Sequence, residues 1–169
     1  MDWRYLDDPK NTEHDPFDFL KRVRLGDNFL FTAGGEFRYR YANEVDSRIT
    51  GTDNVYSLTR ARWYTDLWYR DRIRIYAEMI QADTYDYDIA PLVTDRDRSD
   101  FLNLFVDLKL FEWNEHPIYF RGGRQELLYG SQRLISPLDW ANARRTFQGG
   151  KLFYRGDKLD VDLFLSLIH

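Results

Sequence analysis

Residues 60–79 read RARWYTDLWYRDRIRIYAEM, and this stretch decides the fold class. Over residues 60–69, apolar side chains alternate with charged or polar ones at every second position. A period of two is that of a β-strand, whose successive side chains point to opposite faces. The charged turn 70–72 follows, and the alternation resumes over residues 73–79. The stretch therefore predicts two antiparallel strands joined by a short turn.

Five more runs with this period lie on either side of the pair. They cover residues 35–41, 102–110, 118–129, 151–155 and 159–166. In each run one face carries apolar side chains, such as Leu102 and Leu104, and the other is densely ionised. Alternation fails only at Gly122 and Gly123, where adjacent glycines predict a β-bulge that returns Arg124 to the charged face. We expect an all-β protein with seven antiparallel strands.

The connections between these runs alternate strictly between long and short. The long ones are 46–54, 88–100 and 131–146, and the short ones are 70–72, 114–117 and 156–158. Outer-membrane barrels have this asymmetry, with short periplasmic turns and long outer loops. Strands of about ten residues also suit a tilted membrane crossing. The pattern predicts an antiparallel transmembrane β-barrel, with one face toward lipid and the other toward the pore.

Composition excludes several other classes of protein. The absence of cysteine excludes disulfide scaffolds, thiolate metal centres and cysteine nucleophiles. A net charge of −4 argues against nucleic-acid binding, and 17% aromatic residues argue against disorder. No apolar run reaches the roughly 18 residues of a membrane helix. Because His14, His116 and His169 are scattered, we expect no metal site, no catalytic triad and no cofactor.

The first 27 residues differ from the rest and predict a separate periplasmic segment. Asp15 and Pro16 are typical of a helix start, so we expect one short helix over residues 16–23. Residues 28–169 form the predicted partial barrel. Seven strands are too few and of odd number, and an unpaired strand edge in lipid is costly. We therefore expect the N-terminal part of a larger barrel, with a leader removed or outside the recorded chain.

A long motif then points to a family. The motif comprises Gly123–Glu126, Tyr129–Ile135, Pro137–Trp140, Asn142, Arg145–Phe147 and Gly149. It resembles the alginate-export family of outer-membrane channels, as does the run Gly34–Arg38. The resemblance implies a monomeric, non-enzymatic barrel of about eighteen strands in the outer membrane. It also implies passive passage of an anionic polysaccharide through an arginine-rich lumen, with outer-membrane lipid and periplasmic export proteins as the other candidate partners.

Arginines on the charged face and in the loop 131–146 are the candidate substrate contacts. A guanidinium is always charged and binds a carboxylate through two hydrogen bonds, which suits a uronate polymer. The candidate residues are Arg38, Arg40, Arg60, Arg62, Arg74, Arg121, Arg124, Arg133, Arg144 and Arg145. The same charges also fit plain cross-strand pairing with Glu36, Asp66, Glu78, Asp107, Glu126, Asp160 and Asp162.

The loop 131–146 is too apolar for an outer loop that makes no contacts with the rest of the protein. We expect Leu134, Ile135, Leu138 and Trp140 to pack against the protein. The loop either folds inward and brings its arginines to the pore, or it caps the rim of the barrel.

Three other functions remain open from the sequence alone. The first is a general anion porin for small solutes. The second is a soluble β-sheet carbohydrate-binding module. The third is an outer-membrane glycoside hydrolase that uses Glu78 and Asp107 as its carboxylate pair.

Overall fold

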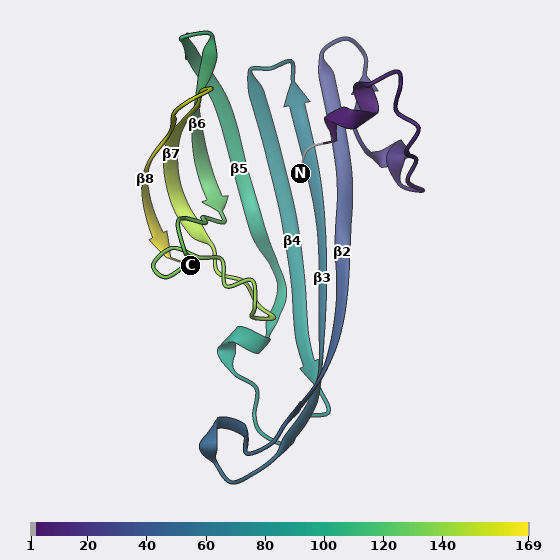
Figure 1. Ribbon diagram of the computed structural model, residues 1–169, viewed down its shortest axis with the longest axis vertical. Coiled ribbons are helices and arrows are strands. Elements are labelled where there is room, and N and C mark those ends of the chain that lie inside the picture. Colours follow the sequence, from purple (N-terminus) through teal and green to yellow (C-terminus); the bar gives the residue numbers. More distant parts are fainter. Residues whose placement is uncertain (1–2, 169) are drawn as a thin grey trace.

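The strands follow one another in chain order in the computed structural model, which describes residues 3–168 (Figure 1). Within that range, eight antiparallel strands form one sheet. They are β1 (Val23–Leu25), β2 (Phe29–Glu44), β3 (Asn54–Tyr69), β4 (Ile73–Tyr85), β5 (Asp97–Trp113), β6 (His116–Gln125), β7 (Phe147–Arg155) and β8 (Asp160–Ile168). The seven predicted strands correspond to β2–β8, and β1 is an additional short strand inside the segment 1–27. His169 lies outside the described residues.

Cross-strand pairing keeps like residues on the same face of the sheet. Asp107 of β5 is opposite Arg74 of β4 on one side and Arg121 of β6 on the other, and Arg121 is in turn opposite Lys151 of β7. The other face is apolar and open to the surroundings. Its exposed side chains include Phe37, Trp63, Ile75, Leu104, Val106, Leu152, Leu163 and Leu165. The predicted division into an apolar and a charged face is therefore confirmed along most of the sheet.

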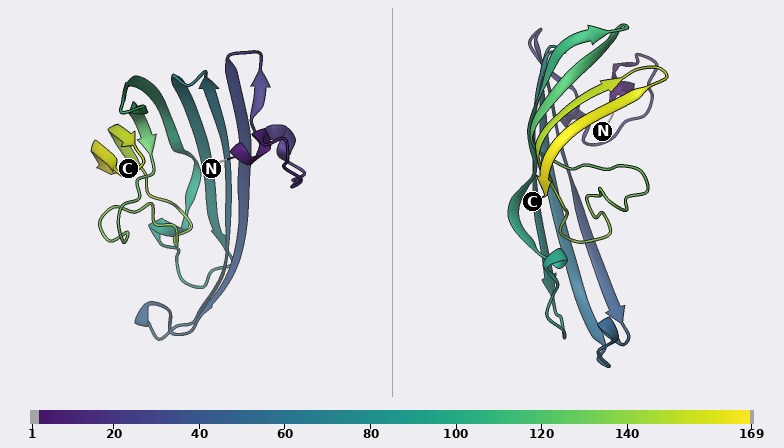
Figure 2. Two further views of the ribbon diagram at one scale, coloured as in Figure 1. Left: turned by 45° about the horizontal axis from the view of Figure 1, so that its top comes forward. Right: turned by 90° about the vertical axis from the view of Figure 1, so that its left-hand side faces the viewer.

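The sheet is curved, and two irregular segments lie over its concave side (Figure 2). One is the N-terminal segment 3–22, and the other is the segment 126–146 between β6 and β7. The charged face is the concave one, because Arg38 on that face donates a hydrogen bond of 3.1 Å to the Ala141 carbonyl oxygen of segment 126–146. The charged side chains thus line a hollow, and the apolar side chains cover the convex surface.

The alternation of long and short connections is confirmed. The short turns 26–28, 70–72, 114–115 and 156–159 lie at one end of the sheet, at the top of Figure 1. The connections 45–53, 86–96 and 126–146 are long and extend toward the opposite end. His116 and Pro117, predicted in a turn, are the first residues of β6.

The predicted bulge at Gly122 and Gly123 is wrong. The pairing of β6 with both neighbours runs through these glycines without a register shift, so Arg124 is opposite Leu104 of β5. Gly123 serves close strand approach instead, because its φ is +133° and a Cβ there would lie 2.3 Å from the Leu104 carbonyl oxygen.

Register shifts lie instead in the pairing of β5 with β4 and with β6, and at one of them Leu102 is the extra residue between Phe101 and Asn103. Its predicted place on the apolar face is wrong as well. The side chain is fully buried in a small core cluster with Ile80 and Ala82 of β4. An extra residue reverses the alternation locally, and the reversal cannot be seen in a run of apolar residues.

The predicted helix over residues 16–23 is also wrong. Only a single 3₁₀ turn, Asp18–Leu20, forms there, and β1 begins at Val23. Asp15 still caps a turn, because its carboxylate accepts a 2.7 Å hydrogen bond from the Phe17 N–H. The Asp15 N–H and the Lys21 ammonium lower the pKa of the Asp18 carboxyl.

Among residues 3–168, none of the helices has the length and apolar character that a membrane-spanning helix needs.

Candidate functional site

Three arginines on the central strands of the charged face are held by carboxylates of the neighbouring strands. Arg62 of β3 lies 2.7 Å from Glu78 of β4. Arg74 of β4 lies 2.8 Å from Asp66 of β3, and Arg121 of β6 lies 2.6 Å from Asp107 of β5. We call these six residues the paired ladder. Each pair joins two adjacent strands, which is the cross-strand arrangement that stabilises a sheet.

Burial makes the ladder pairs tight. The Asp107 side chain is 2% exposed and accepts hydrogen bonds of 2.6 and 2.8 Å from Nε and Nη2 of Arg121. It also lies 3.5 Å from Arg74. The Glu78 side chain is 5% exposed and also accepts a 2.8 Å hydrogen bond from the Asn103 amide. Ion pairs with little access to water are only weakly screened by salt.

A row of stacked aromatic rings supports the ladder. Tyr64, Tyr76 and Phe105 stack across β3, β4 and β5 with centroid distances of 5.8 and 5.0 Å. The Arg121 guanidinium lies 3.6 Å from the centre of the Phe105 ring, which is a cation–π contact. Phe105 was missed in the sequence, although its position midway between Asn103 and Asp107 placed it on the charged face. The Arg74 guanidinium lies 5.1 Å from the centre of the Tyr76 ring, so Arg74 and Arg121 are fixed by rings as well as by carboxylates.

Arginines at the β2 side of the sheet have different partners. Arg38 and Arg60 donate to the Ala141 carbonyl oxygen over 3.1 and 3.4 Å, and Arg40 donates to the Trp140 carbonyl oxygen over 3.4 Å. We call this contact between Arg38, Arg40 and Arg60 and residues 140–142 the loop seam. It brings together residues about a hundred positions apart in the chain.

Asn142 anchors the seam. Its buried amide nitrogen lies 2.9 Å from the Thr59 carbonyl oxygen, 3.2 Å from that of Asp83 and 3.1 Å from that of Asp95. These three carbonyls belong to β3, to β4 and to the connection before β5. A buried side chain with partners on three elements holds segment 126–146 against the sheet. The segment folds inward, as one of the two sequence alternatives predicted.

The three candidate arginines of segment 126–146 differ in whether they make an ion pair. Arg144 is clamped between the carboxylates of Glu126 and Asp139. Arg133 is exposed and Arg145 is half-buried, and neither makes an ion pair within the described part of the chain. The expected packing of the apolar residues fails at two positions, because Leu134 is 90% exposed and Trp140 is 67% exposed. The Trp140 carbonyl accepts a hydrogen bond from Arg40, so its backbone is held although its side chain is exposed.

Arg124 lies at the end of β6 near the long connections. Its guanidinium is 2.6 Å from the Asp100 carboxylate and donates a 2.9 Å hydrogen bond to the Thr146 hydroxyl. It therefore ties β5 and β6 to the start of β7 and is already engaged with a carboxylate.

Carboxylate pairing thus separates the candidate arginines into two classes. Arg60, Arg62, Arg74, Arg121, Arg124 and Arg144 each lie within 4.0 Å of at least one carboxylate. Among residues 3–168, no such ion pair is found for Arg38 or Arg40, and both meet only neutral oxygens. A guanidinium without a carboxylate keeps its full charge available for an anion.

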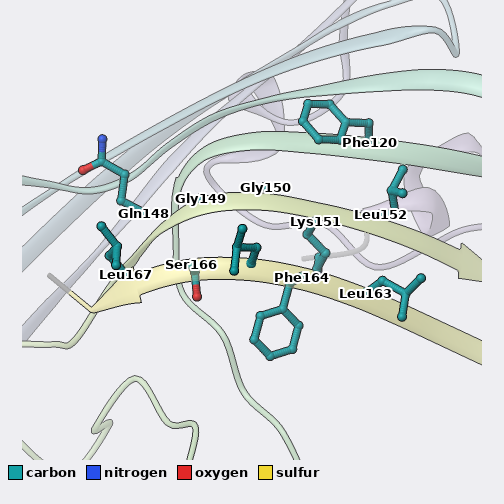
Figure 3. A pocket seen from close by; sticks show the side chains of 11 residues that line it. Phe120, Gln148, Gly149, Gly150, Lys151, Leu152, Leu163, Phe164, Ser166 and Leu167 are labelled. Atoms are coloured by element: carbon teal, nitrogen blue, oxygen red, sulfur yellow. The ribbon is translucent and has the colours of Figure 1, made fainter.

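The convex face holds a shallow apolar groove on β6, β7 and β8 (Figure 3). Leu152, Leu163 and Leu165 line it, and the Phe120 ring lies against Gly122 and Gly150.

Within the described range no three side chains of His, Asp or Glu converge to hold a metal ion. Glu78 and Asp107, the conceivable hydrolase pair, are both bound to arginines. The charged face is therefore the candidate site.

Comparison with known proteins gives one match. A family model described as alginate export matches residues 29–167 of the chain. No curated protein and no solved structure matches.

Proposed function

This chain belongs to the alginate export family of outer-membrane porins, and from that membership we propose that it forms part of the wall of a β-barrel channel in the outer membrane. The channel carries an anionic, alginate-like polysaccharide passively through an arginine-lined lumen. It works as a monomer, without a cofactor and without catalysing a reaction.

The observation that carries this proposal is the two-faced sheet. Apolar side chains such as Trp63, Leu104 and Leu163 are 43, 44 and 65% exposed on the convex surface. Exposed apolar area on this scale is unfavourable in water and favourable against lipid tails. The concave face carries the arginines and acids of the paired ladder and the loop seam. Lipid outside and a hydrated, charged hollow inside are what a membrane channel requires.

The open edges of the sheet support a larger barrel. Within residues 3–168, β8 pairs only with β7, and β1 pairs only with β2. Unpaired backbone N–H and C=O groups in lipid cost several kcal/mol each, so a membrane sheet must close on itself. We propose that further strands complete a barrel of about eighteen strands, which is wide enough for an aqueous lumen.

The lumen chemistry suits an acidic sugar polymer. Each uronate residue carries one carboxylate, and a guanidinium is a planar donor that matches it. A conduit also needs contacts that are weak enough to release the polymer. Carboxylates such as Glu78 and Asp107 reduce the net charge of the wall, which keeps each contact with the polymer weak.

The test is an electrical recording of the complete protein in planar bilayers. An anion-selective pore whose current is blocked by polymannuronate supports the proposal. Anion current without block by the polymer identifies a general anion porin for small solutes instead. No current, from protein that has correctly inserted, would overturn the channel function.

A further inference from the structure

We propose that Arg38, Arg40 and Trp140 form a carboxylate-binding subsite that holds one uronate residue of the polymer at the loop seam. This proposal rests on the proposed channel function, and it names the part of the arginine-rich face that binds the substrate. The paired ladder then has a structural role and does not bind the polymer.

Unpaired charge is the first argument for the subsite. Arg38 and Arg40 are two positions apart on β2, so their side chains lie on the same concave face. Neither makes an ion pair within residues 3–168, whereas every ladder arginine does. The acids nearest to Arg38 and Arg40 are paired with other arginines: Glu36 lies 2.8 Å from Arg60, and Asp139 is bound to Arg144.

Free donors are the second argument. A guanidinium has five N–H groups. Arg38 donates from Nη2 to the Ala141 carbonyl and, over 3.4 Å, to the Asn142 amide oxygen, while its buried Nε has no partner. Arg40 makes one hydrogen bond within residues 3–168, over 3.4 Å from Nη1 to the Trp140 carbonyl. Most donors of the exposed Arg40 side chain are therefore open to a bidentate carboxylate.

Trp140 supplies the third element of a sugar site. Its side chain is 67% exposed, an unusual state for an indole in a segment that is held in place. Its own carbonyl accepts the hydrogen bond from Arg40, so the exposed indole and the Arg40 guanidinium start from backbone positions that are in contact. An aromatic ring packs on the C–H face of a pyranose, and a neighbouring guanidinium binds the carboxylate at C5. Together they recognise a uronate more specifically than either does alone.

Anchoring by Asn142 preorganises the subsite. The contacts of Asn142 with three carbonyl oxygens fix the backbone at this residue, which directly follows Ala141 and lies two positions after Trp140. A site that is already ordered costs less entropy to occupy. The backbone of Trp140 is thus held beside β2, and its side chain is exposed.

The experiment compares block of the pore by a mannuronate hexamer in the complete protein and in three variants. The variants are the double substitution Arg38→Gln with Arg40→Gln, the single substitution Trp140→Ala, and the control Arg24→Gln. Arg24 lies on β1, outside both the ladder and the seam. The neutral hexamer obtained by reducing the carboxyl groups is the matched probe, and chloride current reports that each variant forms an open pore.

We expect the double variant to weaken block by the hexamer about tenfold or more, which corresponds to about 1.4 kcal/mol. Trp140→Ala should weaken block by the hexamer and by the reduced probe alike, whereas Arg24→Gln should change neither. An unchanged block in the double variant with normal chloride current would overturn the subsite and leave the channel intact. A wild-type protein without current would overturn the channel itself, so the two failures are distinguishable.

Discussion

The arginines of the paired ladder and two arginines of the loop seam, Arg38 and Arg40, lie on the same face of the sheet and have opposite kinds of partner, whereas Arg60 of the seam is paired with Glu36. In the ladder, Arg62, Arg74 and Arg121 are held within 2.9 Å by carboxylates of adjacent strands. In the seam, Arg38 and Arg40 donate to uncharged backbone oxygens. The difference teaches that an inward-facing arginine is available to a substrate only if no neighbouring strand supplies its counter-ion.

The cost of burial explains this difference. A buried carboxylate such as Asp107 is tolerated only with a partner, and its partner is thereby committed to the fold. A carbonyl oxygen that accepts one hydrogen bond leaves the charge of a guanidinium unneutralised. The ladder therefore stabilises the wall, and the seam presents charge to the lumen.

The largest expected effect is that of breaking the ladder. Arg121→Ala leaves the Asp107 carboxylate buried, with only the more distant Arg74 beside it. Removing one partner of a buried pair costs about 3–5 kcal/mol, so the free energy of unfolding should fall by an amount of this order. Urea titration of the protein in lipid vesicles measures it. Arg40→Ala is the matched variant of the seam, and an equal loss in both would remove the distinction between the two regions.

A second change tests whether the convex surface, opposite the face that carries the ladder and the seam, contacts lipid. Leu104→Arg places a charge on the convex surface, where it would meet lipid. A lipid-facing arginine near the bilayer midplane costs about 2–4 kcal/mol. The same urea titration applies, with Leu104→Met as the apolar control. If arginine and methionine at this position are equally stable, the convex face does not contact lipid.

Asn142→Ala should detach the seam and leave the ladder intact. The change removes the two N–H donors of the amide that lie against the carbonyl oxygens of Thr59, Asp83 and Asp95, and a buried hydrogen-bonding group left without its partner costs about 1–3 kcal/mol. We expect segment 126–146 to be cleaved faster by protease and the single-channel conductance to rise. Asn43→Ala, at an exposed position of β2, is the control. Unchanged conductance together with unchanged proteolysis would show that Asn142 does not hold the segment.

The smallest expected effect is that of salt. Raising the ionic strength from about 0.1 M to about 1 M shortens the screening length from about 10 Å to about 3 Å. Block by a uronate oligomer at the exposed Arg40 should weaken, and the stability conferred by the buried pairs should change little. Recordings and urea titrations at both salt concentrations give the two responses. Block that is insensitive to salt would argue against charge recognition at the seam.

The faces of the strands and the order of long and short connections were predictable from the sequence. Both depend on local information: a period of two in the run 60–69, and turn residues such as those at 70–72. The motif around Asn142 also indicated the family. The period of two also placed Tyr64, Asp66 and Arg74 correctly on the charged face, because residues two apart on a regular strand share a face.

Three failures of prediction arise where a distant contact overrides a local pattern. Residues 16–23 have a helix start, but pairing of Val23 with Phe31 of β2 draws the chain into β1. Leu102 fits the apolar alternation, but a register shift against β4 turns it inward. Gly122 and Gly123 are typical of a bulge, yet close strand approach is what requires a glycine at Gly123.

The two-faced antiparallel sheet with arginines on one face follows from the sequence, because the face of each strand residue is set by its position in a local alternation. Which arginines are neutralised depends on the folded sheet, because a counter-ion such as Asp107 for Arg121 comes from another strand through the register. The fold alone also placed Ala141 on Arg38, since that contact spans 103 positions and depends on how segment 126–146 crosses the sheet.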